Sequence, residues 1–189
     1  HVYCIRLKFD SGKKINKISP PGLVESEQKF VLGLKEYLRK NKDKFSNVEV
    51  YLLRNFPKLG IGFQLQWAGF YPDFIMWIKN GSKQIIVFID PKGLEHTKTL
   101  DNEKIKFAGF VNNDEETITI KQIQSRLGDK NIVLESFILS WTEYEELKKG
   151  ETKFPSKEEY MNRHVLFLRE PGCLEGLFSN LIKNNSHFF

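Results

Sequence analysis

FYPDFIMWIKNGSKQIIVFIDPK, residues 70–92, is the stretch that decides the fold predicted from this sequence. Its two apolar segments, residues 70–79 and 83–90, are rich in the aromatic and β-branched residues that favour strands. Between them lies Asn80-Gly81, and both residue types tolerate the positive φ that a tight hairpin turn requires. The second segment is apolar enough for a strand inside a sheet, so we expect a central antiparallel hairpin.

The register of this hairpin determines whether two acidic side chains meet. A two-residue turn at Asn80-Gly81 makes Asp73 and Asp90 diagonal neighbours, whereas a four-residue loop over residues 80–83 sets them directly opposite each other. In both registers Asp73, Asp90 and Lys92 share one face, because side chains alternate along a strand. A three-residue loop would instead send the two carboxylates to opposite faces of the sheet.

Two carboxylates beside a central strand are costly unless a cation compensates their charge. Oxygen ligands favour Mg²⁺, with Mn²⁺ as a substitute, and such ions bind one or two carboxylates together with water and phosphate oxygens. We expect Asp73, Asp90 and the backbone carbonyl of Pro91 as ligands. Lys92 would orient an attacking water or stabilise negative charge on a phosphodiester.

Each half of this arrangement, taken alone, also fits an ordinary turn. Asp73 would then cap a turn after Pro72, and residues 90–93 would form a solvated corner. Only their joint position across one hairpin favours a site.

The remaining sequence predicts a layered α/β domain. Helical spacing of apolar residues begins after Pro20-Pro21-Gly22, and Glu27 lies on the inward stripe of that helix, where carboxylates are uncommon. The expected helices cover residues 24–42, 101–108, part of 114–130, and 142–149. The expected further strands cover residues 48–56, 132–141 and 164–169, with a short one at 62–67. Helices and strands in this order predict a single domain over residues 1–189, with its core at about residues 23–170 and a mixed central sheet.

Composition restricts the classes of function. The formal charge of +5 and a pI near 9.1 favour a polyanionic partner. No apolar stretch reaches the length that spans a bilayer, so we expect no membrane contact. Cys4 and Cys173 fit neither a zinc spacing nor a disulfide framework, which indicates a reducing cytoplasm. The first residues lack an initiator methionine and a signal pattern, which indicates a C-terminal fragment of a longer polypeptide.

At these residues the sequence resembles the PD-(D/E)XK nuclease superfamily. Pro72-Asp73 matches the first half of its signature, and Asp90, Pro91 and Lys92 match the second. The wider stretch LRNFPKLGIGFQLQWAGFYPDFIMWIKNGSKQIIVFIDPKGLEH, residues 53–96, is similar to the C-terminal nuclease domain of helicase-type restriction proteins, including type III subunits.

The resemblance implies a restriction-endonuclease-like fold, a three-layer αβα sandwich around the mixed sheet. It also implies Mg²⁺-dependent hydrolysis of phosphodiester bonds in DNA, double-stranded as the usual substrate, and a helicase or translocase region elsewhere in a restriction or phage-defence protein. Members often place a glutamate of the first core helix beside the metal. Glu27 has the matching position here, and Glu25 is the competing residue.

Other residues are weaker candidates, and other functions stay open. His96, Lys98 and Lys104 are candidates for phosphate contacts, although a solvated helix face explains the lysines equally well. Trp67, Trp77 and Trp141 are expected in the core rather than as stacking platforms for bases. The competing hypothesis is a catalytically inactive DNA-binding or assembly module of the same fold, and hydrolysis of RNA or of structured DNA ends is a third. Cutting both strands needs two sites, so a dimer is a further possibility.

Overall fold

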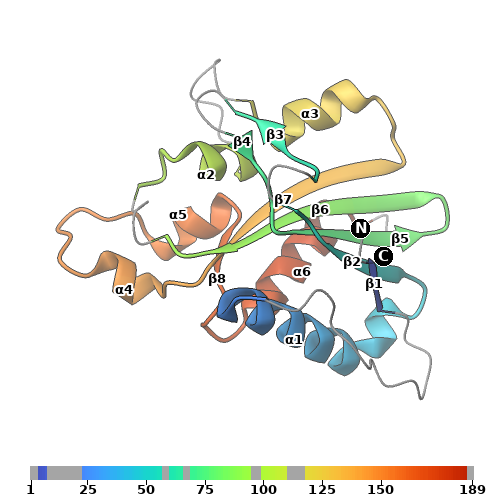
Figure 1. Cartoon of the computed structure of the whole chain (residues 1–189), viewed down its shortest axis with the longest axis horizontal. Coiled ribbons are helices and arrows are strands. Elements are labelled where there is room, and N and C mark those ends of the chain that lie inside the picture. The colour runs from blue at the N-terminus through green and yellow to red at the C-terminus, as the bar shows by residue number, and fades with distance from the viewer. Residues whose placement is uncertain are drawn as a thin grey trace.

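A mixed sheet of six strands runs through the molecule in the order β1-β2-β5-β6-β7-β8 (Figure 1). The computed structural model describes residues 4–7, 23–56, 60–65, 69–94, 99–109 and 118–186. The strands are β1 (Cys4–Leu7), β2 (Glu49–Arg54), β5 (Phe74–Asn80), β6 (Lys83–Lys92), β7 (Ile132–Ser140) and β8 (Val165–Phe167). In this sheet β1, β2, β5 and β6 pair with one another in antiparallel fashion, whereas β6, β7 and β8 pair in parallel. The predicted α/β class with a mixed sheet is therefore confirmed.

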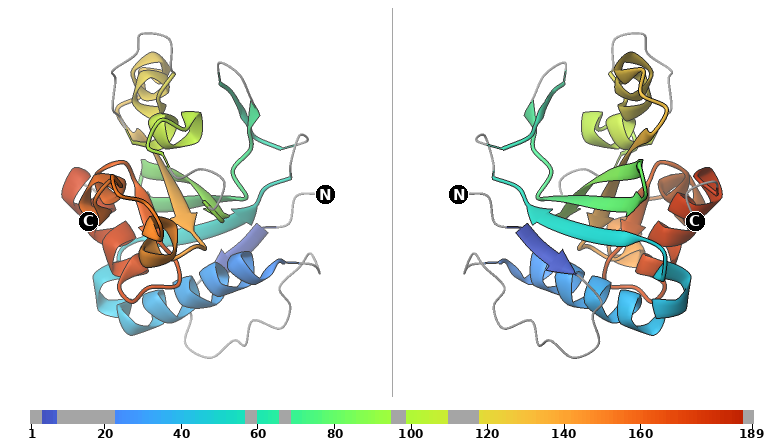
Figure 2. Two further views of the ribbon diagram at one scale, coloured as in Figure 1. Left: turned by 90° about the vertical axis from the view of Figure 1, so that its left-hand side faces the viewer. Right: turned by 90° about the vertical axis from the view of Figure 1, so that its right-hand side faces the viewer.

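Helices lie on both faces of this sheet (Figures 1 and 2). One face carries α1 (Glu25–Lys40) and α6 (Cys173–Asn184), and the 3-10 helix η1 (Lys42–Phe45) follows α1. The other face carries α2 (Glu103–Ala108) and α3 (Ile120–Leu127). Two short helices, α4 (Tyr144–Lys148) and α5 (Lys157–Asn162), pack with β7 and β8. A separate two-stranded ribbon consists of β3 (Phe63–Gln64) and β4 (Gly69–Phe70).

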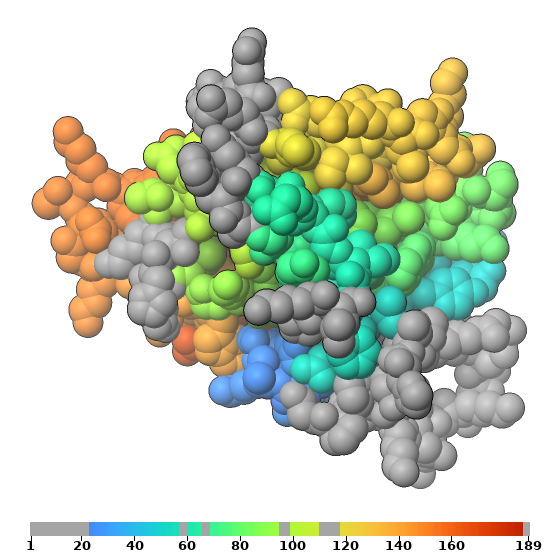
Figure 3. Space-filling model, turned by 45° about the horizontal axis from the view of Figure 1, so that its top comes forward, coloured from blue at the N-terminus to red at the C-terminus, as the bar shows by residue number. Residues whose placement is uncertain are grey.

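Alternation along β5 and β6 divides the apolar core between the two faces. Phe74, Met76, Val87 and Ile89 belong to the larger cluster, which packs against α1 and α6. The residues of opposite parity join a second cluster with α2, α3 and the β3–β4 ribbon, namely Ile75 and Phe88 with Leu65, Phe70, Phe107 and Ile120. The surfaces of β3, β4 and α3 adjoin on this side in the space-filling view (Figure 3). Asp90 shares the parity of Phe88 and therefore faces the α2 side.

The hairpin adopts one of the two registers that keep the acids on one face. Asn80 pairs with Lys83, and Phe74 pairs with Ile89. Extending this register by one residue places Asp73 opposite Asp90, just beyond the last hydrogen-bonded pair. The turn itself is Gly81-Ser82, one residue later than predicted, and Gly81 has φ of 60°. Glycine occupies this position because it adopts a positive φ without steric cost. The three-residue loop is excluded.

The predicted strand over residues 70–79 is wrong in its first third. β4 ends at Phe70 and β5 begins at Phe74, because Pro72 has no N–H to donate to a ladder. By contrast, β6 continues through Lys92, with Asp90 and Pro91 buried. The solvated corner considered for residues 90–93 is therefore also wrong.

The predicted core boundary at residue 170 is wrong as well. Helix α6 follows that boundary and buries Leu174, Leu177, Phe178 and Leu181 in the main cluster. Their spacing of three and four residues is the ordinary signature of an amphipathic helix. The helix expected over residues 142–149 is shorter, because α4 spans Tyr144–Lys148 and its N-cap is Glu143. Among the described residues, no helix is long and apolar enough to cross a bilayer.

Candidate functional site

Asp73 and Asp90 meet where β5 begins and β6 approaches its end. Asp90 is only 4% exposed, and Asp73 is half-buried. Burial raises the pKa of Asp73 from its ordinary value of 3.8 to about 7, assisted by the charge of Asp90, a hydrogen bond between the two carboxyl groups and the charge of Glu27. Two carboxyl groups this close resist simultaneous ionisation. A positive charge beside the pair would therefore stabilise its ionised form.

Asn55 holds the backbone on both sides of Asp73. Its side-chain amide donates to the carbonyls of Ile61 and Pro72 at 2.6 and 2.9 Å, and its side-chain oxygen accepts from the Ile61 N–H. Its own N–H donates to the carbonyl of Asp73 at 2.7 Å. Gly60 makes this clamp possible, because a Cβ there would lie 2.0 Å from the Asn55 side-chain oxygen. These contacts fix the position from which Asp73 reaches Asp90.

Two lysines adjoin the acid pair on the same side of the sheet. The Nζ atom of Lys104, from α2, lies 3.4 Å from Oδ2 of Asp90. Lys92 extends from the end of β6 and is exposed. The charge of Lys104 lowers the pKa of Lys92, burial lowers it further, and the charges of Asp90 and Asp73 oppose both effects. Lys92 shares the strand parity of Asp90 and lies within the electrostatic influence of both acids, whereas Lys104 contacts Asp90 from a different element.

Glu27 enters from α1 and is buried, as its helical position predicted. Its carboxylate binds the guanidinium of Arg54 at 2.9 Å and accepts from the backbone N–H of Val24 at 3.0 Å. Ser26 also connects α1 to the site, because its hydroxyl donates to the carbonyl of Pro91 at 3.3 Å. Glu25 is exposed, which leaves Glu27 as the glutamate directed inward.

Replacing Glu27 by Gln should lower the free energy of unfolding by about 1–3 kcal/mol, because Arg54 loses a buried charged acceptor. Glu25→Gln is the matched control, with the same substitution two residues away on the exposed side of α1, and should change stability by less than about 0.5 kcal/mol. Urea unfolding of both variants measures the difference. Equal stabilities would contradict the assigned partnership of Glu27 and Arg54.

The donor set fits an ion that needs few protein ligands. Within the part of the chain that the structure describes, no group of three or more His, Cys, Asp or Glu side chains is arranged to hold a metal. Asp73 and Asp90 provide two carboxylates, and Mg²⁺ commonly binds one or two and completes its shell with water and phosphate oxygens. Glu27 is engaged by Arg54, and the Pro91 carbonyl already accepts from Ser26. The acid pair fits Mg²⁺ and does not form a closed, all-protein cage.

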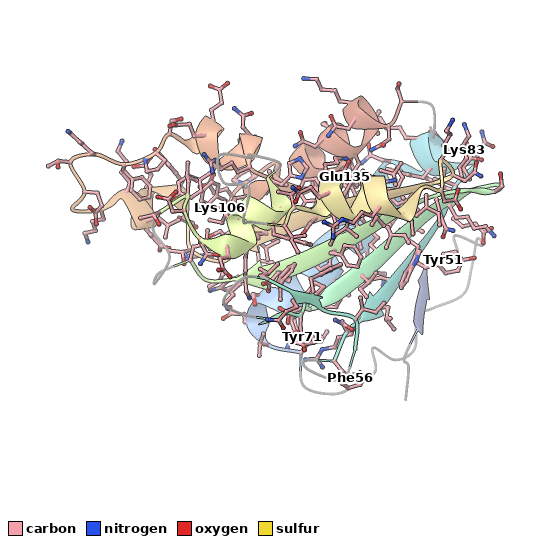
Figure 4. The ribbon with its side chains drawn as sticks, turned by 90° about the horizontal axis from the view of Figure 1, so that it is seen from above. Tyr51, Phe56, Tyr71, Lys83, Lys106 and Glu135 are labelled. Atoms are coloured by element: carbon pink, nitrogen blue, oxygen red, sulfur yellow. The ribbon has the colours of Figure 1, made fainter. Side chains whose placement is uncertain are left out.

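A second buried polar cluster connects α3 to β7 and has a structural role. Glu135 is fully buried in β7, and its carboxylate contacts Nζ of Lys121 at 3.0 Å and lies 3.8 Å from Nδ1 of His164. Burial lowers the pKa of His164, whereas the charge of Glu135 raises it. Figure 4 shows Glu135 beside α3, and Tyr71 and Phe56 on the other side of the view. This cluster ties α3 to β7 rather than extending the site at Asp73.

Arg54 and Asn55 lie at the site but were not predicted from the sequence. His96 and Lys98 fall outside the described residues. Arg54 had a usable signal, because it shares the strand parity of the buried Val50 and Leu52 and so sits at an inward position where charge is uncommon. Asn55 had none, since its three partners come from loops.

The Trp predictions have mixed outcomes. Trp77 and Trp141 are partly buried against the apolar clusters, while Trp67 lies outside the described residues.

Taken together, the described site is an acid pair with two flanking ammonium groups and a buried Glu27–Arg54 pair. Comparison with protein-family models, curated proteins and solved structures finds no match to this chain.

Proposed function

We propose that this domain is a Mg²⁺-dependent endonuclease that hydrolyses phosphodiester bonds in DNA. The observation that carries the proposal is the meeting of Asp73 and Asp90 with Lys92 at the end of a central strand. The pairing of a buried acid couple with adjacent ammonium groups suits a reaction that brings together a cation and a phosphate. The net positive charge of the chain supports a polyanionic substrate.

Each residue at the site has a separate task in this proposal. Asp73 and Asp90 hold the cation, which supplies a polarising charge for the phosphate and for water. Lys92, exposed beside the acids, binds the phosphate and stabilises the charge that develops on its oxygens. Its lowered pKa also makes its proton easier to transfer. Glu27 with Arg54 keeps the start of α1 against the acid pair, and Asn55 fixes the backbone of Asp73.

The wider context belongs to the same proposal. Helices on both faces of a mixed sheet, with the acids on its central hairpin, support a restriction-endonuclease-like three-layer fold. We place the domain in a cytoplasmic restriction or phage-defence protein, with a helicase or translocase region elsewhere in the polypeptide and double-stranded DNA as substrate. Cleavage of both strands would then use two copies of the domain.

One observation favours the alternative, a catalytically inactive DNA-binding or assembly module. Lys104 neutralises Asp90 directly, as an ammonium group would in a site that no longer binds metal. The two functions differ in their response to metal: an inactive module binds DNA or its partner equally well in Mg²⁺ and in EDTA.

Supercoiled, linear and single-stranded DNA, each incubated with Mg²⁺, Mn²⁺ or EDTA, test the proposal. We expect nicks or breaks with either metal and none in EDTA, and loss of at least about a thousandfold in rate for Asp90→Asn, since the metal contributes several kcal/mol to the barrier. Asp101→Asn is the matched control, because Asp101 is 87% exposed and pairs with Lys106 rather than with the site. Cleavage that persists in EDTA or in Asp90→Asn would reject the proposal.

A further inference from the structure

Lys104 is held over the acid pair by elements unrelated to the hairpin. It is the second residue of α2, whose N-cap Asn102 accepts a hydrogen bond from the Lys104 N–H at 2.9 Å. Its ammonium group lies 5.2 Å from the centre of the Phe70 ring and 3.4 Å from Oδ2 of Asp90. The Lys104 side chain is 27% exposed and that of Asp90 is 5% exposed. The lysine therefore reaches from solvent to a buried carboxylate.

When all six of its ionisable groups are charged, the site has no net charge even without a metal ion. The three acids are Glu27, Asp73 and Asp90, and the three bases are Arg54, Lys92 and Lys104, which gives a net formal charge of zero when all are ionised. Arg54 neutralises Glu27, and Lys104 neutralises Asp90. A divalent cation added to this set brings two uncompensated positive charges into a partly buried site. Such a site is favoured to release a positive charge, as a proton from Asp73 or as an ammonium group, or to gain an anion.

Lys104 is the base in the best position to be released. Arg54 binds a glutamate enclosed between α1 and β2, whereas the contact of Lys104 with Asp90 is a single one at 3.4 Å, from a long flexible side chain that is partly in solvent. The carboxylate it contacts is the same one that the proposed function assigns to the metal. An ammonium group and a divalent ion therefore compete for Asp90.

We propose that Lys104 is a positioning residue that exchanges with the metal: it binds Asp90 in the metal-free site and moves to a phosphate of the substrate when a divalent ion occupies Asp90. This inference rests on the proposed function. Because the phosphate provides the anion for the displaced ammonium, metal and DNA each strengthen the binding of the other. The site thereby binds metal weakly until DNA is present.

Competition for Asp90 and a simple phosphate contact predict different effects of removing Lys104 on metal affinity. Removing a lysine that only contacts DNA weakens DNA binding and leaves the metal affinity unchanged. Removing a competitor for Asp90 tightens metal binding in the absence of DNA. The same change reduces the coupling between metal and DNA, because no displaced ammonium remains for the phosphate to bind.

Calorimetric titration of the full chain with Mn²⁺, with and without a phosphorothioate-linked DNA duplex that resists hydrolysis, tests the proposal. Lys104→Gln should bind Mn²⁺ about tenfold more tightly than the unmodified protein in the absence of DNA, and its affinity should respond less to the duplex. Lys104→Arg keeps a cation at Asp90 and should restore the weak affinity. Lys106→Gln removes an equal charge from the same helix, where Lys106 pairs with Asp101, and should change the affinity by less than about twofold.

The outcomes separate this inference from the proposed function. Equal Mn²⁺ affinity in the unmodified protein and Lys104→Gln, together with metal-dependent cleavage, would overturn the exchange and leave the nuclease proposal standing. Tightening of the same size in Lys106→Gln would also overturn it, because the effect would then be general charge rather than competition. Absence of Mn²⁺ binding in every variant, with no cleavage, would reject both.

Discussion

Asp73→Asn is expected to abolish metal-dependent cleavage while making the metal-free protein more stable. The carboxylate is half of the proposed cation site, so its loss should lower the cleavage rate by about a thousandfold or more. In the absence of a cation, however, the same carboxylate is buried against Asp90, which is why its pKa rises to about 7. An amide of the same shape removes that unfavourable charge. Activity and stability should therefore change in opposite directions.

The stability gain of Asp73→Asn should increase with pH, because folding raises the pKa of Asp73. The folded chain binds the Asp73 proton more tightly than the unfolded chain, whose pKa is near 3.8. The contribution of Asp73 to stability is therefore fully present below about pH 4 and is lost as the pH rises through about 7. Asp73→Asn should approach the stability of the unmodified protein at pH 4 and exceed it at pH 8. After discounting for partial exposure we expect about 1–2 kcal/mol, or about 4 °C in thermal midpoint.

Thermal unfolding in EDTA at pH 4 and pH 8 measures this difference, and Asp101→Asn again serves as the control for loss of an exposed carboxylate. Added Mg²⁺ should stabilise the unmodified protein at pH 8 and leave Asp73→Asn unchanged, since only the former retains both ligands. A midpoint difference between Asp73→Asn and the unmodified protein that is the same at both pH values would contradict the assigned environment of Asp73.

Phe178→Ala should produce the largest loss of stability, about 3–5 kcal/mol in the free energy of unfolding. Phe178 is fully buried in α6, stacks on Tyr37 with ring centres 4.7 Å apart and meets the edge of Phe45 at 5.1 Å. Its removal leaves a cavity between α1, η1 and α6 that rigid neighbours fill only in part. Urea unfolding followed by circular dichroism provides the measurement.

The matched control for Phe178 is Phe56→Ala, the same substitution at a side chain that is 38% exposed. This variant should lose about 1 kcal/mol or less, because little apolar surface returns to water. Similar losses in the two variants would show that α6 is not part of the cooperative core. The comparison therefore tests the correction that extends the core beyond residue 170.

Much of the fold was predictable because its signals are local. Runs rich in β-branched and aromatic residues predicted β2, the β5–β6 hairpin and β7, and helical spacing with an inward Glu27 predicted α1. The boundary errors have local causes too. Gly81 rather than Asn80 leads the turn because of its freedom at positive φ, and Pro72 ends the ladder before Asp73.

The sequence by itself determined that Asp73 and Asp90 lie on the same hairpin, since a ladder relates every residue of one strand to a partner on the next. It left three registers open, two with the acids on one face of the sheet and one with them on opposite faces. The three-dimensional structure selected the register that sets the acids directly opposite each other. Only tertiary structure could bring Lys104, Arg54 and Asn55 to the site, because α2, β2 and the loops reach it through packing rather than through any periodic pattern. Periodicity reports which face of an element is buried, whereas the partner that covers that face is decided by how the whole chain packs.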